Sequence, residues 1–463
     1  MKVPILVIGG GLSGLAAAIR IARFSPEVLL IEKHSRLGGL NSYFYRNKIL
    51  FETGLHAITN YAEPEIKKAP LNRLLRQLKL SRKDLTFCRQ IASEILFQDG
   101  QSLVFTNDFE AFIAEVNAKF PKAENDFNHL LRFLDTFDPF LPAPFRSTRK
   151  FLAEIIADPL LIEMMLCPLM YYGSSYEEDM DLSQFAIMFR AIFQEGMFRP
   201  QGTIKDFIDL LDDHYRDLGG TRRLGCGIKR ILTQQKRAFG VELESGETMG
   251  CDHIVSTIGH AETLRLIDSG SVPEEKLPRL GFIESIFHVR PGSFSNPLPA
   301  NRTIIFFNKG NRFRYRSPED QVDFSSGVIC FPGNFQDMPA RNVLEIRTTH
   351  LANASKWKKL AESSSEYREQ KQAAARQSVK LVENMIGSFS ANIVYEDTFT
   401  PVTIERYTSK IGGAIYGSPH KVKDGDIGFA NLFLAGTDQG FLGIIGSMLS
   451  GVSIVNQHIL PKL

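Results

Sequence analysis

The sequence is poor in two residue types that often define a protein class. It has a single tryptophan and five cysteines among 463 residues, and no two cysteines form a Cys-x-x-Cys pair. Because the cysteines are odd in number and scattered, with no histidine at ligand spacing, we expect neither a disulfide framework nor a metal site. The pattern is typical of reduced, mostly buried thiols in a cytoplasmic protein. The five are Cys88, Cys167, Cys226, Cys251 and Cys330.

Charge of one sign and long apolar runs are also lacking. The 54 basic and 52 acidic residues form no long block of one sign, so we expect no nucleic-acid partner. We find no window of about 18 apolar residues without charge, so we expect no membrane-spanning helix. The N-terminus does not resemble a secretory signal. These features predict a cytoplasmic protein that is either fully soluble or peripheral to a membrane.

What the sequence does contain is a nucleotide-binding unit at residues 3–51. An apolar run, predicted to be a strand, leads into three glycines with separate physical roles. Gly9 permits the tight turn, Gly11 lets the backbone approach a pyrophosphate, and Gly14 lets the following helix pack close to the sheet. The spacing predicts a dinucleotide-binding turn.

The residues after this turn complete the unit. Residues 12–24 form a predicted helix, whose free amide groups and dipole favour an anion at its start. A second apolar strand, residues 28–31, ends at Glu32, which stands eighteen residues after Gly14. An acid at this place is expected to bond a ribose hydroxyl, and it would repel a 2'-phosphate. NADP is therefore not expected at this site.

The rest of the chain predicts helices first and strands later, in an interleaved order. Tyr171 and Tyr172 fall outside the predicted helices and read as loop residues, and the charged stretch 362–377 reads as a solvated helix face. Apolar positions at three- and four-residue spacing predict helices at residues 108–119, 124–137, 151–165, 182–193 and 203–218. Apolar runs predict strands at residues 239–243, 253–257, 282–290, 302–308, 328–331 and 343–349.

The 35 phenylalanines leave two interpretations open. They line a large apolar cavity, or they form a phenylalanine-rich core. Residues 137–156 raise a related question, because apolar side chains and prolines are followed there by a small cationic cluster. Such a segment docks onto an anionic membrane surface, or it is an ordinary proline-rich loop. Its main residues are Phe137, Pro139, Phe140, Leu141, Pro142, Pro144, Phe145, Arg146, Arg149, Lys150, Phe151 and Leu152.

The C-terminal region returns to glycine-rich sequence. Residues 431–438 predict a short strand and a glycine turn, and an apolar segment with Gly440, Gly443, Gly446 and Gly451 follows. Small residues here suit close approach of the backbone to a cofactor, or packing of a terminal helix on the sheet. Both interpretations stay open.

Taken in order, these motifs resemble the flavin-dependent carotenoid desaturase and isomerase superfamily, including retinol saturase-like enzymes, over nearly the whole chain. Two residues depart from the pattern of this superfamily: Leu40 stands where its members commonly have an arginine, and Gln201 where they more usually have a glycine. The resembling segments are Val7 to Gly14 with Glu32, Arg36-Leu37-Gly38-Gly39, Phe51-Glu52-Thr53-Gly54-Leu55-His56, Phe198-Arg199-Pro200-Gln201-Gly202, Gly219-Gly220 with Gly227-Ile228, Thr400-Pro401-Val402-Thr403, Gly412 to Gly417, and Leu434 to Gly451.

The resemblance implies an α/β fold in which a Rossmann-type FAD-binding domain is interleaved with a mixed-sheet substrate domain and a helical cap. It implies non-covalent FAD, with Glu32 on the adenosine ribose, Ile228 beside the adenine and residues 436–438 near the ribityl chain and pyrophosphate. The implied FAD-binding residues are Gly9, Gly11, Leu12, Ser13, Gly14, Glu32, Lys33, Gly38, Gly39, Leu40, Asn41, Ile228, Gly436, Asp438 and Gly446. The implied domains are 1–60, 203–262 and 425–463 for FAD, 61–202 for the cap and first part of the substrate domain, and 263–424 for its sheet.

The resemblance also implies hydride transfer between the flavin and a long apolar polyene or polyunsaturated lipid, giving desaturation, saturation or isomerisation. Hydride loss from an allylic carbon leaves a delocalised cation, so shape and a few dipoles can replace a strong base. His56 is the candidate for proton transfer or substrate orientation, although a lone histidine is more often structural. An FAD-dependent amine oxidase and a catalytically silent flavin- or lipid-binding protein are the alternatives.

Overall fold

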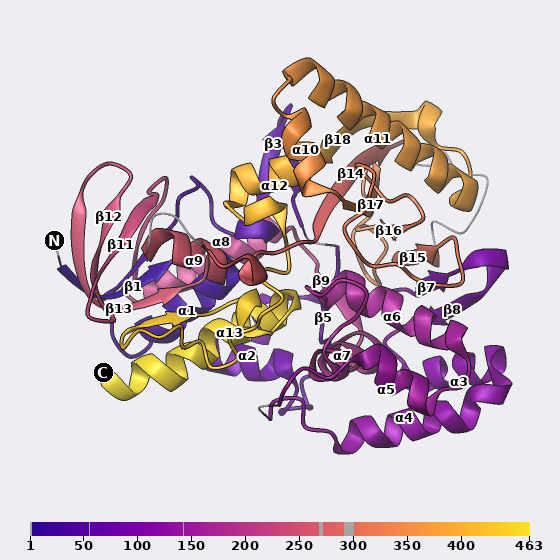
Figure 1. The fold of residues 1–463 in the computed structure, drawn as a ribbon, viewed down its shortest axis with the longest axis horizontal. Helices are drawn as coiled ribbons and strands as arrows, with labels where there is room; N and C mark the ends of the chain where they lie inside the picture. The colour runs from indigo at the N-terminus through magenta and orange to yellow at the C-terminus, as the bar shows by residue number, and fades with distance from the viewer. Residues whose placement is uncertain (1, 55, 142, 268–271, 291–300) are drawn as a thin grey trace.

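The helices and strands of the protein form three lobes. The computed structural model describes residues 2–54, 56–141, 143–267, 272–290 and 301–463. Leu55 and Pro142, which the sequence analysis named, lie outside the described residues. Figure 1 shows one lobe that carries both chain ends, a second built on a sheet beneath orange helices, and a third made of helices.

The first lobe is a seven-stranded sheet assembled from three separate stretches of the chain. Its strand order is β10-β2-β1-β13-β12-β11, with β19 beside β13. Strands β10, β2, β1, β13 and β19 run parallel, whereas β11, β12 and β13 form an antiparallel meander. The strands are β1 (Lys2–Ile8), β2 (Val28–Ile31), β10 (Thr221–Arg223), β11 (Ile228–Gln234), β12 (Arg237–Leu243), β13 (Thr248–Ser256) and β19 (Leu432–Leu434).

Helices cover this sheet, and those at the two predicted ranges 12–24 and 203–218 follow the predictions closely. The second strand has the predicted bounds, and the first helix ends at Ala22, two residues before the predicted end. The predicted helix 203–218 begins with a capping box, in which the Thr203 and Asp206 side chains each accept a backbone N–H. The helices of this lobe are α1 (Leu12–Ala22), α2 (Pro70–Leu78), α8 (Ile204–Asp217), α9 (His260–Ile267) and α13 (Gly443–Ile454).

The C-terminal helix bears on the expectation that no helix spans a membrane. The helical stretch Gly443–Lys462 is long and apolar enough to cross a membrane, with a mean hydropathy of 1.2. Half of it is buried inside the protein, as in the core helix of a folded domain. At Gly451 it lies so close to α1 that a Cβ atom would stand 2.2 Å from the carbonyl oxygen of Ser13. Gly451 therefore packs α13 on α1 rather than directly on the sheet.

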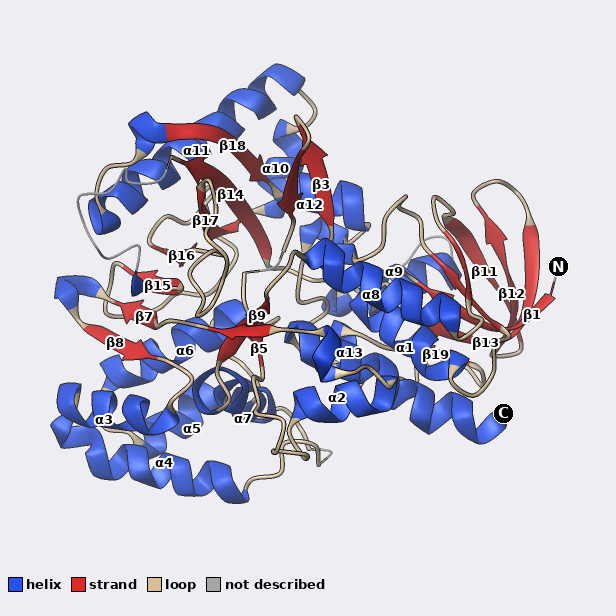
Figure 2. Ribbon diagram, turned by 180° about the vertical axis from the view of Figure 1, so that it is seen from behind, coloured by secondary structure: helices blue, strands red, loops and turns tan. Residues whose placement is uncertain are grey.

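The second lobe is a mixed sheet, also of seven strands, in the order β18-β14-β17-β16-β15-β7-β8. Figure 2 shows α10 (Ala354–Leu360) and α11 (Ser364–Ile386) over one face, which buries aliphatic and aromatic side chains against α11. The other face meets the helical lobe. The strands are β7 (Ser93–Leu96), β8 (Ser102–Phe105), β14 (Gly281–Val289), β15 (Ile304–Asn308), β16 (Ser326–Cys330), β17 (Leu344–Ala352) and β18 (Ile393–Phe399).

The helical lobe corrects two predictions. The predicted helix 151–165 is two helices, because Asp158 caps a new helix and Pro159 occupies its first turn. Tyr171 and Tyr172 lie in that second helix and not in a loop. The helices are α3 (Phe109–Lys119), α4 (Glu124–Thr136), α5 (Thr148–Ile155), α6 (Pro159–Gly173) and α7 (Leu182–Phe189), the last followed by a π-helical turn (Arg190–Gln194).

Short elements join the three lobes. The hairpin of β3 and β4 leads from the first lobe towards the second, and helix α12 lies between them (Figure 1). These elements are β3 (Tyr43–Arg46), β4 (Ile49–Glu52), β5 (Ile58–Thr59), β6 (Phe87–Arg89), β9 (Met197–Pro200) and α12 (Pro401–Thr408). The α/β fold with an interleaved second sheet and a helical cap, expected from the sequence, is confirmed.

Many phenylalanines form a packed core in and beneath the helical lobe. The rings of Phe112 and Phe193 stack with centroids 4.4 Å apart, and Phe105 meets Phe193 edge-on at 5.1 Å. Aromatic pairs at these separations add to the free energy gained by burial alone. For these residues, the core interpretation of the phenylalanine content is the correct one.

Candidate functional site

The glycine turn after β1 has the geometry that a bound phosphate needs. Gly9 has φ +100°, and a Cβ atom on Gly14 would lie 1.9 Å from the Gly9 carbonyl oxygen. At Gly9 and Gly14, protein atoms therefore already occupy the space that a side chain would need. At Gly11 the nearest atom to an added Cβ is the Cα of Gly39 at 3.9 Å, so space is open there. Open space beside the start of α1 is where the backbone can approach a pyrophosphate.

A second glycine pair closes this space from the other side. The Gly38 N–H donates a hydrogen bond to the Gly10 carbonyl at 2.8 Å, which presses residues 38–39 against the turn. The Ser13 hydroxyl is buried and has no partner among the described residues, and Gly11 caps α1 without any side-chain hydrogen bond. Gly436 also faces open space, its added Cβ being no closer than 3.7 Å to any atom. Unpaired donors around an open cradle fit the pyrophosphate of FAD.

Glu32 follows β2 at the same edge of the sheet. Its carboxylate accepts the N–H of Gly10 at 2.6 Å and the N–H of His34 at 2.7 Å. A carboxylate has about four lone-pair sites, so it can still accept ribose hydroxyls. The Glu32 carbonyl accepts the N–H of Cys226, which brings the loop before Ile228 to this edge. The ribose role of Glu32 and the adenine role of Ile228 stay predictions.

Five other predicted cofactor residues face different surroundings. Lys33 is exposed and pairs with Glu244 at 2.9 Å, and Leu12 is buried, so only its backbone faces the cradle. Leu40 and Asn41 lie in the short 3-10 helix Gly39–Asn41 beside the cradle. Gly446 packs on its own preceding loop, where a Cβ would stand 3.3 Å from the carbonyl carbon of Phe441.

Asp438 ties the C-terminal segment to its neighbours. Its two carboxylate oxygens accept the N–H of Ser418 at 2.7 Å and the N–H of His260 at 2.6 Å. Lys421 lies 3.8 Å away; burial lowers the pKa of this lysine to about 8, although the charge of Asp438 opposes the shift. Asp438 therefore holds three loops together beside Gly436. Its predicted bond to cofactor hydroxyls stays a prediction.

The segment after β4 runs from the cradle towards the second sheet. A Cβ on Gly54 would lie 2.5 Å from the carbonyl oxygen of Leu40, so this segment touches the residues after the glycine pair. Two residues on, the Nε2 atom of His56 lies 3.0 Å from Oε2 of Glu284 on β14. Both side chains are mostly buried, with 17% and 11% of their surface exposed. His56 thus stands between the cofactor cradle and the second sheet.

A buried ion network supports this pair. The fully buried Arg347 bonds Glu345 at 2.6 Å and the Glu52 carbonyl at 2.9 Å, and lies 3.3 Å from the second oxygen of Glu284. Burial alone would lower the pKa of Arg347, but the three carboxylates around its guanidinium raise the pKa above its usual range. Although burial alone would raise the pKa of Glu345, the Arg347 guanidinium holds it well below its usual range. Glu284 is therefore anchored at one oxygen and free to hold His56 with the other.

A group of partly buried apolar side chains lies at the junction where the cap core meets the second sheet. Tyr172, Met338, Ile415 and Tyr416 pack against the cap core but keep part of their surface exposed. Phe282 of β14 backs this junction, with its ring edge-on to Tyr416 at 5.8 Å. Such a junction, lined by aromatic and aliphatic side chains, suits an apolar ligand.

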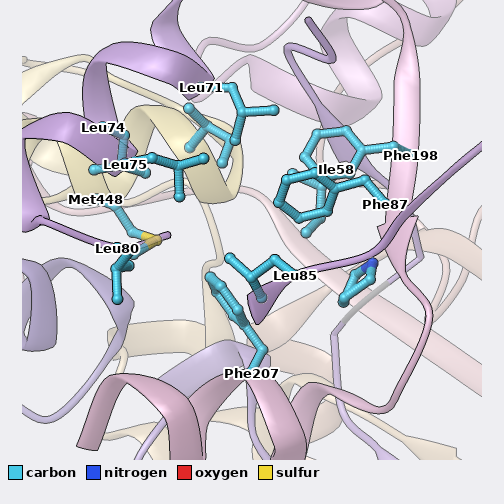
Figure 3. A pocket seen from close by; sticks show the side chains of 12 residues that line it. Ile58, Leu71, Leu74, Leu75, Leu80, Leu85, Phe87, Phe198, Phe207 and Met448 are labelled. Atoms are coloured by element: carbon cyan, nitrogen blue, oxygen red, sulfur yellow. The ribbon is translucent and has the colours of Figure 1, made fainter. Parts of the chain in front are cut away.

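A separate apolar pocket lies in the first lobe. Figure 3 shows leucines of α2 and Met448 of α13 facing Ile58, Phe87 and Phe198. Its volume is about 10 Å³, close to the least that holds one water molecule. It is a gap in the packing of the nucleotide lobe and not a substrate site.

Sequence reasoning found His56 but missed its partners. Glu284 lies 228 residues away in the chain, within a run read only as an apolar strand. The available signal was a charged residue inside that run, because a buried charge requires a partner. The same signal marks Glu345 and Arg347 inside β17.

Comparison with known proteins agrees with this geometry. The chain is 23% identical to 4,4'-diaponeurosporene oxygenase of Staphylococcus aureus (strain USA300), over 90% of this chain and 88% of that protein. It is 22% identical to the chloroplastic prolycopene isomerase of Arabidopsis thaliana, over 91% of this chain and 76% of that protein.

Solved structures share the fold. An oxidoreductase from Methanosarcina mazei superposes with a TM-score of 0.67 at 15% identity, covering 98% of this chain and all of the other. A putrescine oxidase variant superposes with a TM-score of 0.64 at 13% identity, covering 100% and 99%. The family model described as flavin containing amine oxidoreductase matches residues 12–284, more than half of the chain. The chain therefore belongs to the flavin containing amine oxidoreductase family, and its cofactor is FAD.

Proposed function

We propose that this FAD-dependent oxidoreductase acts on a long apolar polyene or polyunsaturated lipid of carotenoid, retinoid or acyl type, by desaturation, saturation or isomerisation. The observation that carries the proposal is the match, over about nine-tenths of this chain, to two proteins whose names give carotenoids as substrates. The bound flavin would supply a hydride acceptor or donor. The chain's own residues bind the cofactor, orient the substrate and exclude water.

The apolar junction supports this substrate class. Tyr172, Met338, Ile415 and Tyr416 offer a partly exposed aromatic and aliphatic wall between the cap and the sheet. A polyene gains free energy from burial against such a wall, at roughly 25 cal/mol for each Å² removed from water. The junction lies on the same side of the sheet as Glu284. Burial is the main reason why the pKa of Tyr172 is raised, and the charge of Glu284 adds to the shift.

His56 is the proposed proton-exchanging group. Nε2 of His56 faces the carboxylate of Glu284, and with Nε2 as the donor of this hydrogen bond, Nδ1 is left to exchange a proton. This is the arrangement in which a carboxylate fixes the tautomer and orientation of a catalytic histidine. A saturase or isomerase adds a proton to a substrate carbon, and a desaturase removes a proton from the cation that hydride loss leaves, so each reaction needs a proton-exchanging group.

An amine oxidase is the second candidate, because the putrescine oxidase variant shares the fold. An uncompensated acid in the site would favour binding of a cationic amine. Glu284 is the acid beside His56, and it already contacts both His56 and Arg347. The negative charge of Glu284 is therefore compensated by Arg347, which favours an apolar substrate over a cationic amine.

Anaerobic flavin spectroscopy tests the two candidates. Purified protein with bound FAD is mixed with a carotenoid or retinoid in liposomes, and in parallel with putrescine, while the flavin absorbance near 450 nm is followed. We expect the polyene to bleach oxidised flavin or to restore the absorbance of reduced flavin. Bleaching by putrescine alone would support the amine oxidase. If the protein holds no flavin, or if its flavin never changes redox state with any polyene, the result contradicts the proposal and supports a catalytically silent binding protein.

We also propose a location in the cytoplasm with peripheral contact to a membrane. All five cysteines are free, and four are buried, which suits a reducing compartment. The cap loop exposes Phe140 by 57%, Leu141 by 62% and Phe145 by 48%. Arg146 and Lys150 are exposed beside them. The Phe140 ring also stacks, with centroids 5.8 Å apart, on Phe441 in the loop before α13.

Not all of the segment first considered for docking takes part. Phe151 and Leu152 are buried in the cap core, and Arg149 pairs with Glu163. Moving an exposed apolar side chain out of water contributes about 1.5–3 kcal/mol, so Phe140 and Leu141 together can hold the loop on a lipid surface.

A liposome flotation assay tests the docking. We expect Phe140→Ser with Leu141→Ser to reduce the bound fraction on anionic vesicles at least tenfold. The matched control is Phe239→Ser, which removes a phenylalanine of similar exposure, 51%, from β12 of the first lobe. Equal loss in both variants, or no binding by the unaltered protein, would contradict a docking loop.

A further inference from the structure

Tyr172 carries a buried hydroxyl that the protein leaves without a partner. It lies in the last turn of α6, with its ring edge-on to Phe306 of β15 at 5.5 Å and 64°. Within the described part of the chain, no donor or acceptor reaches its Oη atom, which exposes less than 1 Å². The residue as a whole is only partly buried, so part of its surface is left free of protein atoms.

The neighbouring tyrosines behave differently. Tyr171 shares a hydrogen bond of 2.9 Å with the Ser326 hydroxyl. Tyr315 donates to the carbonyl of Ser174 at 2.9 Å, and Tyr416 donates to the carbonyl of Tyr171. The fold thus satisfies these three hydroxyls within one aromatic cluster, whereas the Tyr172 hydroxyl has no partner among the described residues.

An unpaired buried hydroxyl disfavours folding, and phenylalanine would fill the same space without that cost. A tyrosine here therefore indicates a hydrogen-bond partner from outside the chain. Burial raises the pKa of Tyr172 well above its usual range, with Cys330, Tyr416 and Glu284 adding to the shift. The hydroxyl stays protonated and therefore has a proton to donate, which an oxygen acceptor from outside the chain would take up.

We infer that Tyr172 Oη donates a hydrogen bond to an oxygen atom of the substrate, so that the substrate is a polyene or lipid with a hydroxyl, carbonyl or ether oxygen at the end held in this junction. The inference rests on the proposed function, because it requires an apolar substrate between the cap and the sheet. It adds a polar anchor to a site that is otherwise apolar. Such an anchor sets both the register and the direction of a long chain relative to the flavin.

Ligand discrimination tests the inference without any turnover. Retinol and the matching hydrocarbon without its hydroxyl are partitioned between FAD-loaded protein and liposomes, and the bound amounts give two dissociation constants. We expect the unaltered protein to prefer the alcohol by at least about tenfold, since sites built around a hydrogen bond reject ligands that lack it. Tyr172→Phe should weaken alcohol binding by about tenfold, leave hydrocarbon binding unchanged and so lose the preference.

Tyr315→Phe is the matched control, because it removes a satisfied hydroxyl from the same cluster. It should lower the midpoint of thermal unfolding and keep the preference. Tyr172→Phe without ligand should unfold at the same temperature as the unaltered protein or higher.

Three outcomes would overturn the inference alone. These are equal affinity of the unaltered protein for both ligands, a fall in unfolding temperature for Tyr172→Phe as large as for Tyr315→Phe, and a shifted flavin spectrum in Tyr172→Phe with the preference intact. The second would show a permanent buried partner such as water, and the third would show that the partner is the cofactor. If neither ligand binds to any form of the protein, the inference and the proposed function both fail.

Discussion

Alanine at Gly11 and at Gly14 should separate cofactor contact from protein packing. Both glycines belong to the turn between β1 and α1, but their surroundings are opposite. An added Cβ at Gly11 finds its nearest neighbour 3.9 Å away, whereas at Gly14 it would stand 1.9 Å from a carbonyl oxygen and 3.0 Å from the Thr257 hydroxyl. Gly11 also has φ −68° and ψ 173°, which alanine adopts without strain.

The magnitudes follow from these distances. At Gly11, losing glycine at a helix cap costs about 0.5–1 kcal/mol, and the smaller entropy of the unfolded chain returns a similar amount. The stability of the apoprotein should therefore change by less than about 1 kcal/mol. FAD must then share its space with a methyl group, and overpacking of about 1–3 kcal/mol corresponds to a loss of about 10- to 100-fold in affinity. Gly14→Ala places the same methyl group against the backbone and should destabilise the apoprotein by at least 1–3 kcal/mol.

Two measurements check the pair. Thermal unfolding of apoprotein should show Gly11→Ala close to the unaltered protein and Gly14→Ala clearly lower. Titration with FAD, followed by quenching of its fluorescence, should show the large affinity loss in Gly11→Ala. If Gly11→Ala binds FAD as tightly as the unaltered protein, the backbone does not meet the cofactor there, and the cradle is misplaced.

Three further predictions concern single side chains. Glu32→Ala should lower FAD occupancy after purification, measured by absorbance, and full retention of affinity would remove its ribose role. Burial raises the pKa of Glu195 to about 7, so the free energy of unfolding should fall as pH rises from about 4.5 to 7. Glu195→Gln should remove that dependence and add about 2–3 kcal/mol to the free energy of unfolding at pH 8. An unchanged pH profile in the variant would contradict the shift. Arg347→Met should cost about 3–5 kcal/mol in chemical unfolding, because it leaves Glu345 and Glu284 buried without their cation, and a neutral result would show that the network is not coupled.

Local patterns predicted the nucleotide lobe well because each of its signals is short. The strand at Val28–Ile31 needed only four apolar residues and the acid after them. The helical cap was harder, since apolar periodicity continues across residues 151–165 even though Pro159 begins a new helix there. Periodicity reports which face is buried, whereas capping chemistry decides where a helix starts.

The functional site depends on contacts that no local pattern contains. His56 was nominated from its motif, but its partner Glu284 comes from the second lobe and is held by Arg347 from a third stretch of chain. The sequence predicts Tyr172 to be a loop residue, although it lies in α6 at the junction of the cap and the second sheet. Sequence spacing cannot bring such residues together, because their proximity results from how the sheet and the cap pack.

The central claim is that the flavin of this protein exchanges a hydride with an apolar polyene. The most direct measurement is an anaerobic single turnover, in which FAD-loaded protein is mixed with a polyene in liposomes, and flavin absorbance and polyene products are followed together. The account predicts that flavin absorbance changes at the rate at which the polyene gains or loses a double bond, or that the polyene isomerises only when flavin is bound. A flavin that responds to putrescine and to no polyene would contradict it.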